Sequence, residues 1–167
     1  MLIHQGNHIG DSWYYVVDNE VVHCFYLTCP DTIERHTAWD ISHATSSDFV
    51  NWTIHDLALK KGEPGTYDGN CPATGSVIRF QDRYWLAYTG NWNGPVPTVA
   101  LAMSDDLYHW EKCSWNPATS IDPMYYETMG SAPRNWPYWR DPFLFEHKGF
   151  VYHYVCARLN KGKNNTR

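Results

Sequence analysis

The chain has 167 residues, of which 16% are aromatic and only 19% are charged, and its formal charge is −5 at pH 7. This length fits one domain with a buried hydrophobic core. An acidic chain without a cluster of basic residues lacks the electrostatic surface of a nucleic-acid-binding protein. The sequence contains no run of 18 apolar residues, so no transmembrane helix is predicted. We therefore expect neither a nucleic-acid partner nor a membrane partner.

The N-terminus and the cysteines suggest a compartment. The start, "MLIHQGNHIGD", lacks the basic residues and apolar stretch of a signal peptide. The five cysteines are odd in number and match no zinc-binding spacing. Free thiols and a cytoplasmic location are therefore expected. His4 and His8 are four residues apart but lie in no predicted helix, so we expect no metal site there. We expect no other cofactor.

From the N-terminus onward, short runs of β-branched and aromatic residues alternate with turn residues. A first hairpin, "SWYYVVDNEVVHCFYL" (12–27), is followed by "SSDFVNW" (46–52). A second, "GSVIRFQDRYWLAYTG" (75–90), is followed by "SDDLYHW" (104–110), and a third, "PFLFEHKGFVYHYVCA", spans 142–157. No stretch has apolar residues at helical spacing over three turns. The pattern predicts an all-β fold of antiparallel strands.

These units repeat. Both seven-residue segments have the pattern Ser-x-Asp-apolar-x-x-Trp and follow a hairpin and a strand. Repeats of about 40–50 residues with four strands each are typical of β-propeller blades. We predict about two and a half blades, one over about 1–62, one over about 63–128, and the start of a third over about 137–167. The repetition identifies Asp48 and Asp106 as turn formers and Trp52 and Trp110 as core residues.

Three motifs in this order resemble the invertase and levanase family of glycoside hydrolases, which are five-bladed propellers. "SHATSSDFVNW" is similar to the family's "WGHATSxDLxxW", and "DGNCPATGSVIRF…YWLAYTG" is similar to "GCWSGSA…YTG". "WRDP" is similar to "FRDP". The resemblance runs over essentially the whole chain, and part of it is shared with the arabinanase and xylosidase family. It implies a partial propeller that acts on an oligosaccharide or small sugar.

The resemblance also implies site residues. Asp11 lies twelve residues before His23, which is the position of the family's nucleophilic aspartate, although Ser12, Trp13 and Tyr14 replace the Pro-Asn-Gly that follows it in the family's "WMNDPNG". Leu27 stands where the family has a sugar-binding glutamine. Thr74 stands where the family has the first serine of "SGS", and we expect it to donate to the sugar or to pack.

Glycosidic cleavage requires two carboxyl groups around an oxocarbenium-like transition state. Asp11 and Asp141 each precede the first strand of a unit, and such strands converge on a propeller's central channel. The resemblance implies Asp11 as nucleophile, and this convergence predicts Asp141 as stabiliser of positive charge. Arg140 is expected to bind the sugar and to hold Asp141 ionised, because a nearby cation favours a carboxylate.

Tryptophans that do not repeat between units are candidates for stacking on a sugar face. They are Trp13, Trp39, Trp92, Trp136 and Trp139.

The family's acid, a glutamate in an "EC" motif, has no counterpart here. Glu127 and Glu146 lie in other contexts, and Glu146 is expected in a hairpin turn. We therefore interpret the chain as an N-terminal portion of a propeller, whose remaining blades come from self-association or a second chain. Two alternatives stay open: an inverting arabinanase- or xylosidase-like hydrolase, with Asp11 as general base, and a non-catalytic carbohydrate-binding propeller fragment.

Overall fold

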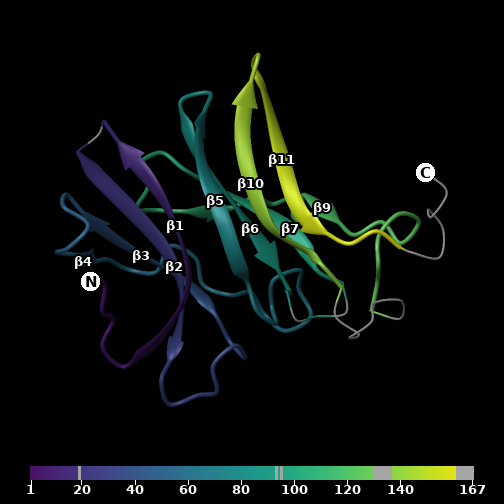
Figure 1. Cartoon of the computed structure of the whole chain (residues 1–167), viewed down its shortest axis with the longest axis horizontal. Helices are drawn as coiled ribbons and strands as arrows, with labels where there is room; N and C mark the ends of the chain where they lie inside the picture. The colour runs from purple at the N-terminus through teal and green to yellow at the C-terminus, as the bar shows by residue number, and fades with distance from the viewer. Residues whose placement is uncertain (19, 93, 95, 130–136, 161–167) are drawn as a thin grey trace.

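The computed structural model describes residues 1–18, 20–92, 94, 96–129 and 137–160. Within these ranges the regular elements are strands and no helix is present, which confirms the predicted all-β fold. The same ranges contain no helix that could cross a membrane. Figure 1 shows the strands grouped into three sheets that lie side by side. All five cysteines are free thiols, as predicted.

The first sheet is an antiparallel meander in the order β1-β2-β3-β4. Its strands are β1 (Asn7–Val17), β2 (Val21–Pro30), β3 (Asp40–Ser46) and β4 (Thr53–Ile54). β2 is buried along nearly its whole length, because it lies in the interior of the sheet between β1 and β3.

The second sheet repeats this meander in the order β5-β6-β7-β8, and β9 also pairs with β7. Its strands are β5 (Ala73–Phe80), β6 (Arg83–Gly90), β7 (Thr98–Ser104), β8 (Glu111–Lys112) and β9 (Thr119–Ser120). Gln81 and Asp82 connect β5 to β6 with φ of 51° and 61°. Positive φ at both central residues is the conformation of a type I′ hairpin turn, which suits the twist of the flanking strands.

The third sheet is the hairpin of β10 (Trp139–His147) and β11 (Phe150–Ala157). Its turn also has two positive φ angles, 53° at Lys148 and 79° at Gly149. Glu146 Oε1 accepts a hydrogen bond of 2.6 Å from the Gly149 N–H. Glu146 is therefore a turn residue, as predicted.

The first strand of the middle sheet, β5, packs between β1 and β10, so the first strands of all three sheets lie next to one another (Figure 1). This is the arrangement of propeller blades around a centre, as the repeats predicted. The sheets fall within the predicted blades, whose boundaries stay a prediction.

Separate cores fill the two spaces between the sheets. The first contains large buried side chains from the first and second sheets, among them Trp13, Phe25, Trp39, Leu86 and Tyr88. The second lies between the second and third sheets and contains Ala87, Val99, Trp139 and Leu144.

The repeated seven-residue segments form the same turn in both sheets. Asp48 Oδ1 and Asp106 Oδ1 each accept hydrogen bonds from the backbone N–H groups two and three residues later. Trp52 and Trp110 each donate the indole N–H to a backbone carbonyl of the turn, at 3.2 and 2.9 Å. Both rings are partly buried and pack against a core. The predicted turn and core roles of these four residues are confirmed.

Candidate active site

The first strand of each sheet contains a β-bulge, and each bulge lies at a predicted site residue. The pairing of β1 with β2 shifts register around Asp11. The pairing of β5 with β6 shifts at Thr74, and the pairing of β10 with β11 shifts around Asp141. A bulge adds one residue to one strand and redirects its side chain. The three bulges thus take these three side chains out of the regular alternation of their strands.

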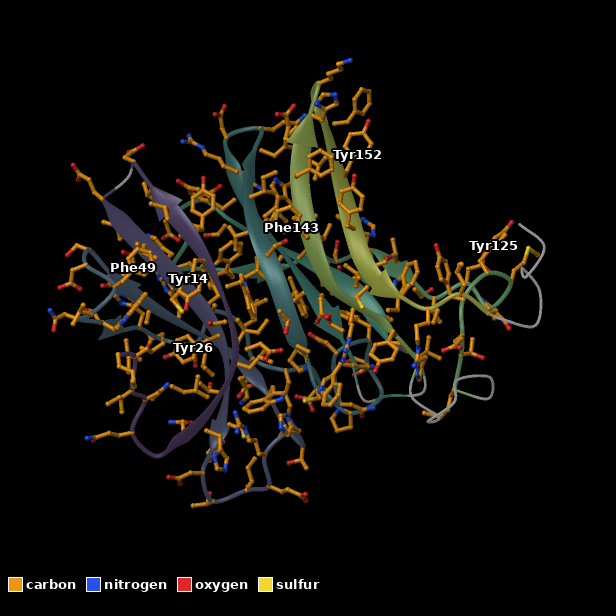
Figure 2. The ribbon with its side chains drawn as sticks, viewed as in Figure 1. Tyr14, Tyr26, Phe49, Tyr125, Phe143 and Tyr152 are labelled. Carbon is orange, nitrogen blue, oxygen red and sulfur yellow. The ribbon has the colours of Figure 1, made fainter. Side chains whose placement is uncertain are left out.

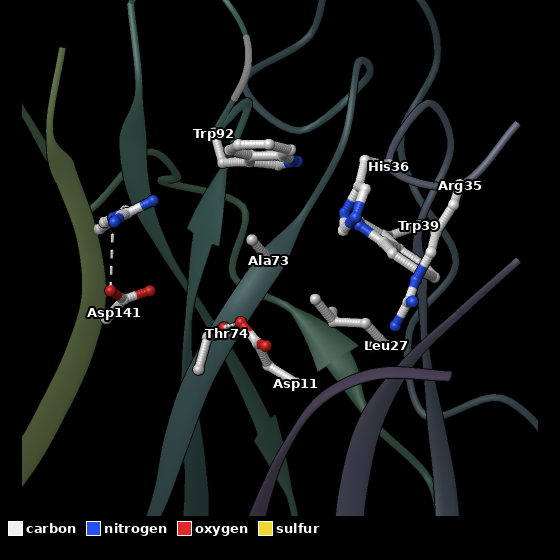
Figure 3. A pocket seen from close by; sticks show the side chains of 11 residues that line it. Asp11, Leu27, Arg35, His36, Trp39, Ala73, Thr74, Trp92 and Asp141 are labelled. Atoms are coloured by element: carbon white, nitrogen blue, oxygen red, sulfur yellow. Dashed lines mark hydrogen bonds and ion pairs between the residues drawn. The ribbon is translucent and has the colours of Figure 1, made fainter. Parts of the chain in front are cut away.

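The redirected side chains line one pocket of about 210 Å³. Figure 3 shows Asp11 beside Thr74, with Asp141 on one side and Trp39 on the other. The prediction that the two carboxylates face one channel is therefore confirmed. Within the described residues, they are the only carboxylates that line this pocket.

Thr74 holds Asp11 directly. The Thr74 hydroxyl donates a 2.6 Å hydrogen bond to Asp11 Oδ2, and this bond joins the first sheet to the second. The threonine proton is therefore engaged by the carboxylate. The sequence analysis expected Thr74 to donate to a sugar or to pack. The structure adds another role, which is to orient Asp11.

Asp141 has an uncommon backbone conformation, with φ of 55° in the left-handed region. Its N–H donates to Thr89 Oγ1 at 2.9 Å, and Thr89 Oγ1 in turn donates to the Thr74 carbonyl at 3.1 Å. Thr89 is fully buried at the end of β6. One hydroxyl therefore connects the bulge of β10 to the bulge of β5. Sequence analysis missed Thr89, because only the packing of the third sheet on the second reveals its partners.

The electrostatics of Asp141 differ from the expectation. Burial raises the pKa of its carboxyl, the Arg140 guanidinium lowers it, and the Asp11 carboxylate raises it further, so the net pKa lies above the ordinary aspartate value. Arg140 Nε lies 3.4 Å from Asp141 Oδ2, the pair marked by the dashed line at Asp141 in Figure 3. Arg140 does favour the ionised form, but burial has the larger effect. The predicted effect of Arg140 is thus present, and burial opposes it.

The predicted tryptophans fall into two groups. Trp39 and Trp92 line the pocket, Trp39 with its ring largely buried. Trp13 and Trp139 do not line the pocket. Trp13 stacks on Phe25 in the first core, and Trp139 lies in the second core with its indole N–H donated to Thr119 Oγ1. The structure thus corrects the expectation of sugar stacking for these two, while Trp136 lies outside the described residues.

Two nitrogen-bearing side chains in the pocket were missed by the sequence analysis. Arg35 and His36 come from the loop between β2 and β3 and lie on the side of the pocket away from Asp141 (Figure 3). Arg35 Nη2 donates to the Ile9 carbonyl at 2.7 Å, and the His36 ring makes edge contacts with Trp39 and Trp92. The loop carries no recognisable motif, so the sequence contained no signal for it. Leu27 also lines the pocket.

The sequence model of the family described as "Glycosyl hydrolases family 32 N-terminal domain" matches residues 5–166. The chain belongs to glycosyl hydrolase family 32. Fructan 6-exohydrolase of Beta vulgaris is 37% identical over 128 residues, which cover 73% of this chain and 20% of that protein. Sucrose-6-phosphate hydrolase of Bacillus subtilis (strain 168) is 30% identical over 133 residues, covering 77% and 25%. The chain thus spans a quarter or less of these relatives.

Solved structures show the same fold. Fructofuranosidase from Schwanniomyces occidentalis complexed with fructose superposes with a TM-score of 0.71 at 19% identity, covering 92% of this chain and 30% of that one. Sucrose-6-phosphate hydrolase from Lactobacillus gasseri gives 0.70 at 22% identity, covering 89% and 28%. These similarities support the five-bladed propeller class for the family 32 chain.

The two glutamates considered in the sequence lie outside the pocket of this family 32 chain. Glu146 is in the β10–β11 turn. Glu127 is buried, and its Oε2 lies 2.8 Å from Arg158 Nε. Neither therefore lines the pocket that contains Asp11 and Asp141.

Proposed function

We propose that the protein to which this chain belongs hydrolyses β-fructofuranosides with retention of configuration. The observation that carries the proposal is the convergence of Asp11 and Asp141, from two different sheets, on one pocket with aromatic walls. The curated relatives, named as a fructan exohydrolase and a sucrose-6-phosphate hydrolase, support a fructosyl substrate.

Asp11 serves as the nucleophile. Because Thr74 hydrogen-bonds to Oδ2, Oδ1 remains available to attack the anomeric carbon. The new carbon–oxygen bond forms as the bond to the leaving oxygen breaks, and the electron pair of the broken bond goes to that oxygen, which takes up a proton. Water then cleaves the fructosyl ester and regenerates the carboxylate.

Asp141 stabilises the positive charge that develops on the sugar ring between these steps. Its hydrogen bonds to ring hydroxyls strengthen as that charge forms, so they lower the barrier rather than only binding the substrate. Trp92, which is partly exposed, presents aromatic surface to the sugar, and the fully buried Trp39 contributes to the pocket wall. The proton for the leaving oxygen comes from an acid outside the described part of this chain, since Asp11 and Asp141 are already engaged.

The test uses the complete protein and measures turnover of sucrose and of a fructan. Asp11→Asn removes the attacking charge and should lower kcat by about 10³-fold or more, equivalent to about 4 kcal/mol of barrier. Proton NMR of the first product formed should show the anomer of the substrate. Asp105→Asn is the matched control, because Asp105 is an exposed carboxylate paired with Arg83 away from the pocket.

Two results would contradict the proposal. Full activity of Asp11→Asn would remove Asp11 as nucleophile, and an inverted product would favour the general-base alternative. If the complete wild-type protein binds fructose without hydrolysing either substrate, the carbohydrate-binding alternative replaces the enzyme.

A further inference from the structure

Tyr138, which does not line the pocket, contacts two arginines. The Arg140 guanidinium carbon lies 4.2 Å from the centre of the Tyr138 ring, and that of Arg158 lies 4.0 Å from it. Both distances are within the range of cation–π attraction. Arg140 also contacts Asp141 in the pocket, whereas Arg158 does not line the pocket. Tyr138 therefore links a pocket arginine to one outside it.

Two like charges on one ring repel each other unless one is neutralised, and Glu127 supplies the neutralising charge. The Glu127 residue is 3% exposed, and its Oε2 lies 2.8 Å from Arg158 Nε. The Glu127 N–H also donates to the Arg158 carbonyl at 2.9 Å, in a short stretch where 126 and 159 form a β-bridge. This glutamate and arginine are thus fixed by both backbone and side chain.

The contacts form a continuous series from Glu127 through Arg158, Tyr138 and Arg140 to Asp141. An arginine side chain has many rotamers, and its planar group binds well only when it is pre-organised. The Tyr138 ring restricts the Arg140 guanidinium on one side, while Arg140 Nε lies 3.4 Å from Asp141 Oδ2.

We propose that Tyr138, supported by the Glu127–Arg158 ion pair, is a positioning residue that holds Arg140 against Asp141. The inference rests on the proposed function of Asp141. Neither Tyr138 nor Glu127 contacts the substrate pocket, so both act through Arg140.

The proposal is tested by comparing Tyr138→Phe with Tyr138→Leu in the complete protein. Phenylalanine keeps the aromatic face, so kcat should stay within about twofold of wild type. Leucine removes the face and frees Arg140, so kcat should fall about tenfold while KM changes little, because the lost interaction acts in the transition state. Glu127→Gln should give a smaller loss of kcat, and Asp105→Asn, which removes an exposed paired carboxylate, should give none.

The pH profile separates positioning from a purely structural role. Arg140 lowers the pKa of Asp141. The acid limb of kcat/KM should therefore move to higher pH in Tyr138→Leu and stay in place in Tyr138→Phe. An acid limb that stays in place in Tyr138→Leu, with only the melting temperature lowered, would overturn the inference. Equal losses in the two variants would also overturn it.

A readout without turnover distinguishes this inference from the proposed function. Carbon-13 NMR of the complete protein follows the Asp141 carboxyl directly. If wild type hydrolyses no fructofuranoside, the proposed function fails, yet a titration midpoint raised by Tyr138→Leu and not by Tyr138→Phe would still support the positioning role. An unchanged midpoint would reject it.

Discussion

At the scale of single residues, the Thr89 hydroxyl makes hydrogen bonds to two bulges, one in β10 and one in β5. It accepts from the Asp141 N–H and donates to the Thr74 carbonyl, and the Thr89 side chain is fully buried while the two hydrogen bonds are partly buried. The left-handed φ of Asp141 is unfavourable for a residue with a side chain. The hydroxyl compensates for this by satisfying a backbone donor that the bulge removes from strand pairing.

Thr89→Val keeps the shape of the side chain and removes the hydroxyl. It removes the partner of one partly buried donor and one partly buried acceptor, which should cost about 1–3 kcal/mol in total because water can still reach these groups in part. Chemical denaturation should show this loss, and kcat should fall with it because Asp141 is displaced. Thr89→Ser, which keeps the hydroxyl, should retain most of the stability and most of kcat. Equal stability of the Val and Ser variants would contradict this role.

The same bulges explain which site residues the sequence could predict. Asp141 was found because its WRDP motif is retained, and Asp11 was found by its spacing from His23, although the residues that follow it differ from the family motif. Trp13 and Trp139 lie two positions from these aspartates, and in a regular strand such residues share a face. Each bulge adds a residue between register pairs, which reverses this relation and turns both rings into cores. Trp13 and Trp139 were chosen because they do not repeat between units, and this criterion carries no information about the bulges that turn their rings away from the pocket.

At the scale of elements, a stack of histidines joins the first two sheets. His23 Nδ1 and His43 Nε2 lie 2.9 Å apart, and His55 lies beside His43 with ring centres 4.9 Å apart. Tyr108 of the second sheet's turn contacts all three rings edge-on. Burial, followed by the neighbouring histidines His23 and His55, lowers the pKa of His43 to about 3. Only the fold brings these rings together, so the sequence could not predict the stack.

This stack predicts loss of stability in acid. Because the folded-state pKa of His43 lies below the ordinary value of about 6.5, the unfolded chain binds a proton that the folded chain excludes between these values. Stability is therefore complete above about pH 6.5 and falls by about 1.4 kcal/mol per pH unit for this histidine as the pH drops toward 3. His43→Gln should show a shallower fall in denaturation experiments between pH 7 and 4. A slope equal to that of wild type would rule out His43 as the cause.

At the scale of the whole molecule, the outer face of the third sheet is aromatic. Phe143 pairs across the strands with Tyr154, and Phe145 pairs with Tyr152. Phe145 stacks on both tyrosines, with ring centres 5.3 and 5.4 Å apart. Phe143 and Tyr154 are 61% and 62% exposed, and Figure 2 shows Phe143 and Tyr152 on this hairpin. In a propeller the next blade covers such a face. The repeats predicted this hairpin, and the structure shows which of its side chains are exposed.

A contiguous apolar patch of this kind favours association. We therefore expect the chain, produced alone, to associate with itself at micromolar concentration, or to bind a second chain that supplies further blades. Light scattering should report more than one chain per particle. Phe143→Lys with Tyr154→Lys should reduce association, because burying two unpaired lysines is unfavourable. Val50→Lys, at an exposed apolar position in the turn after β3, should not. A monomeric wild-type chain would show that the face is stable in water, and association unchanged by the double substitution would place the contact elsewhere.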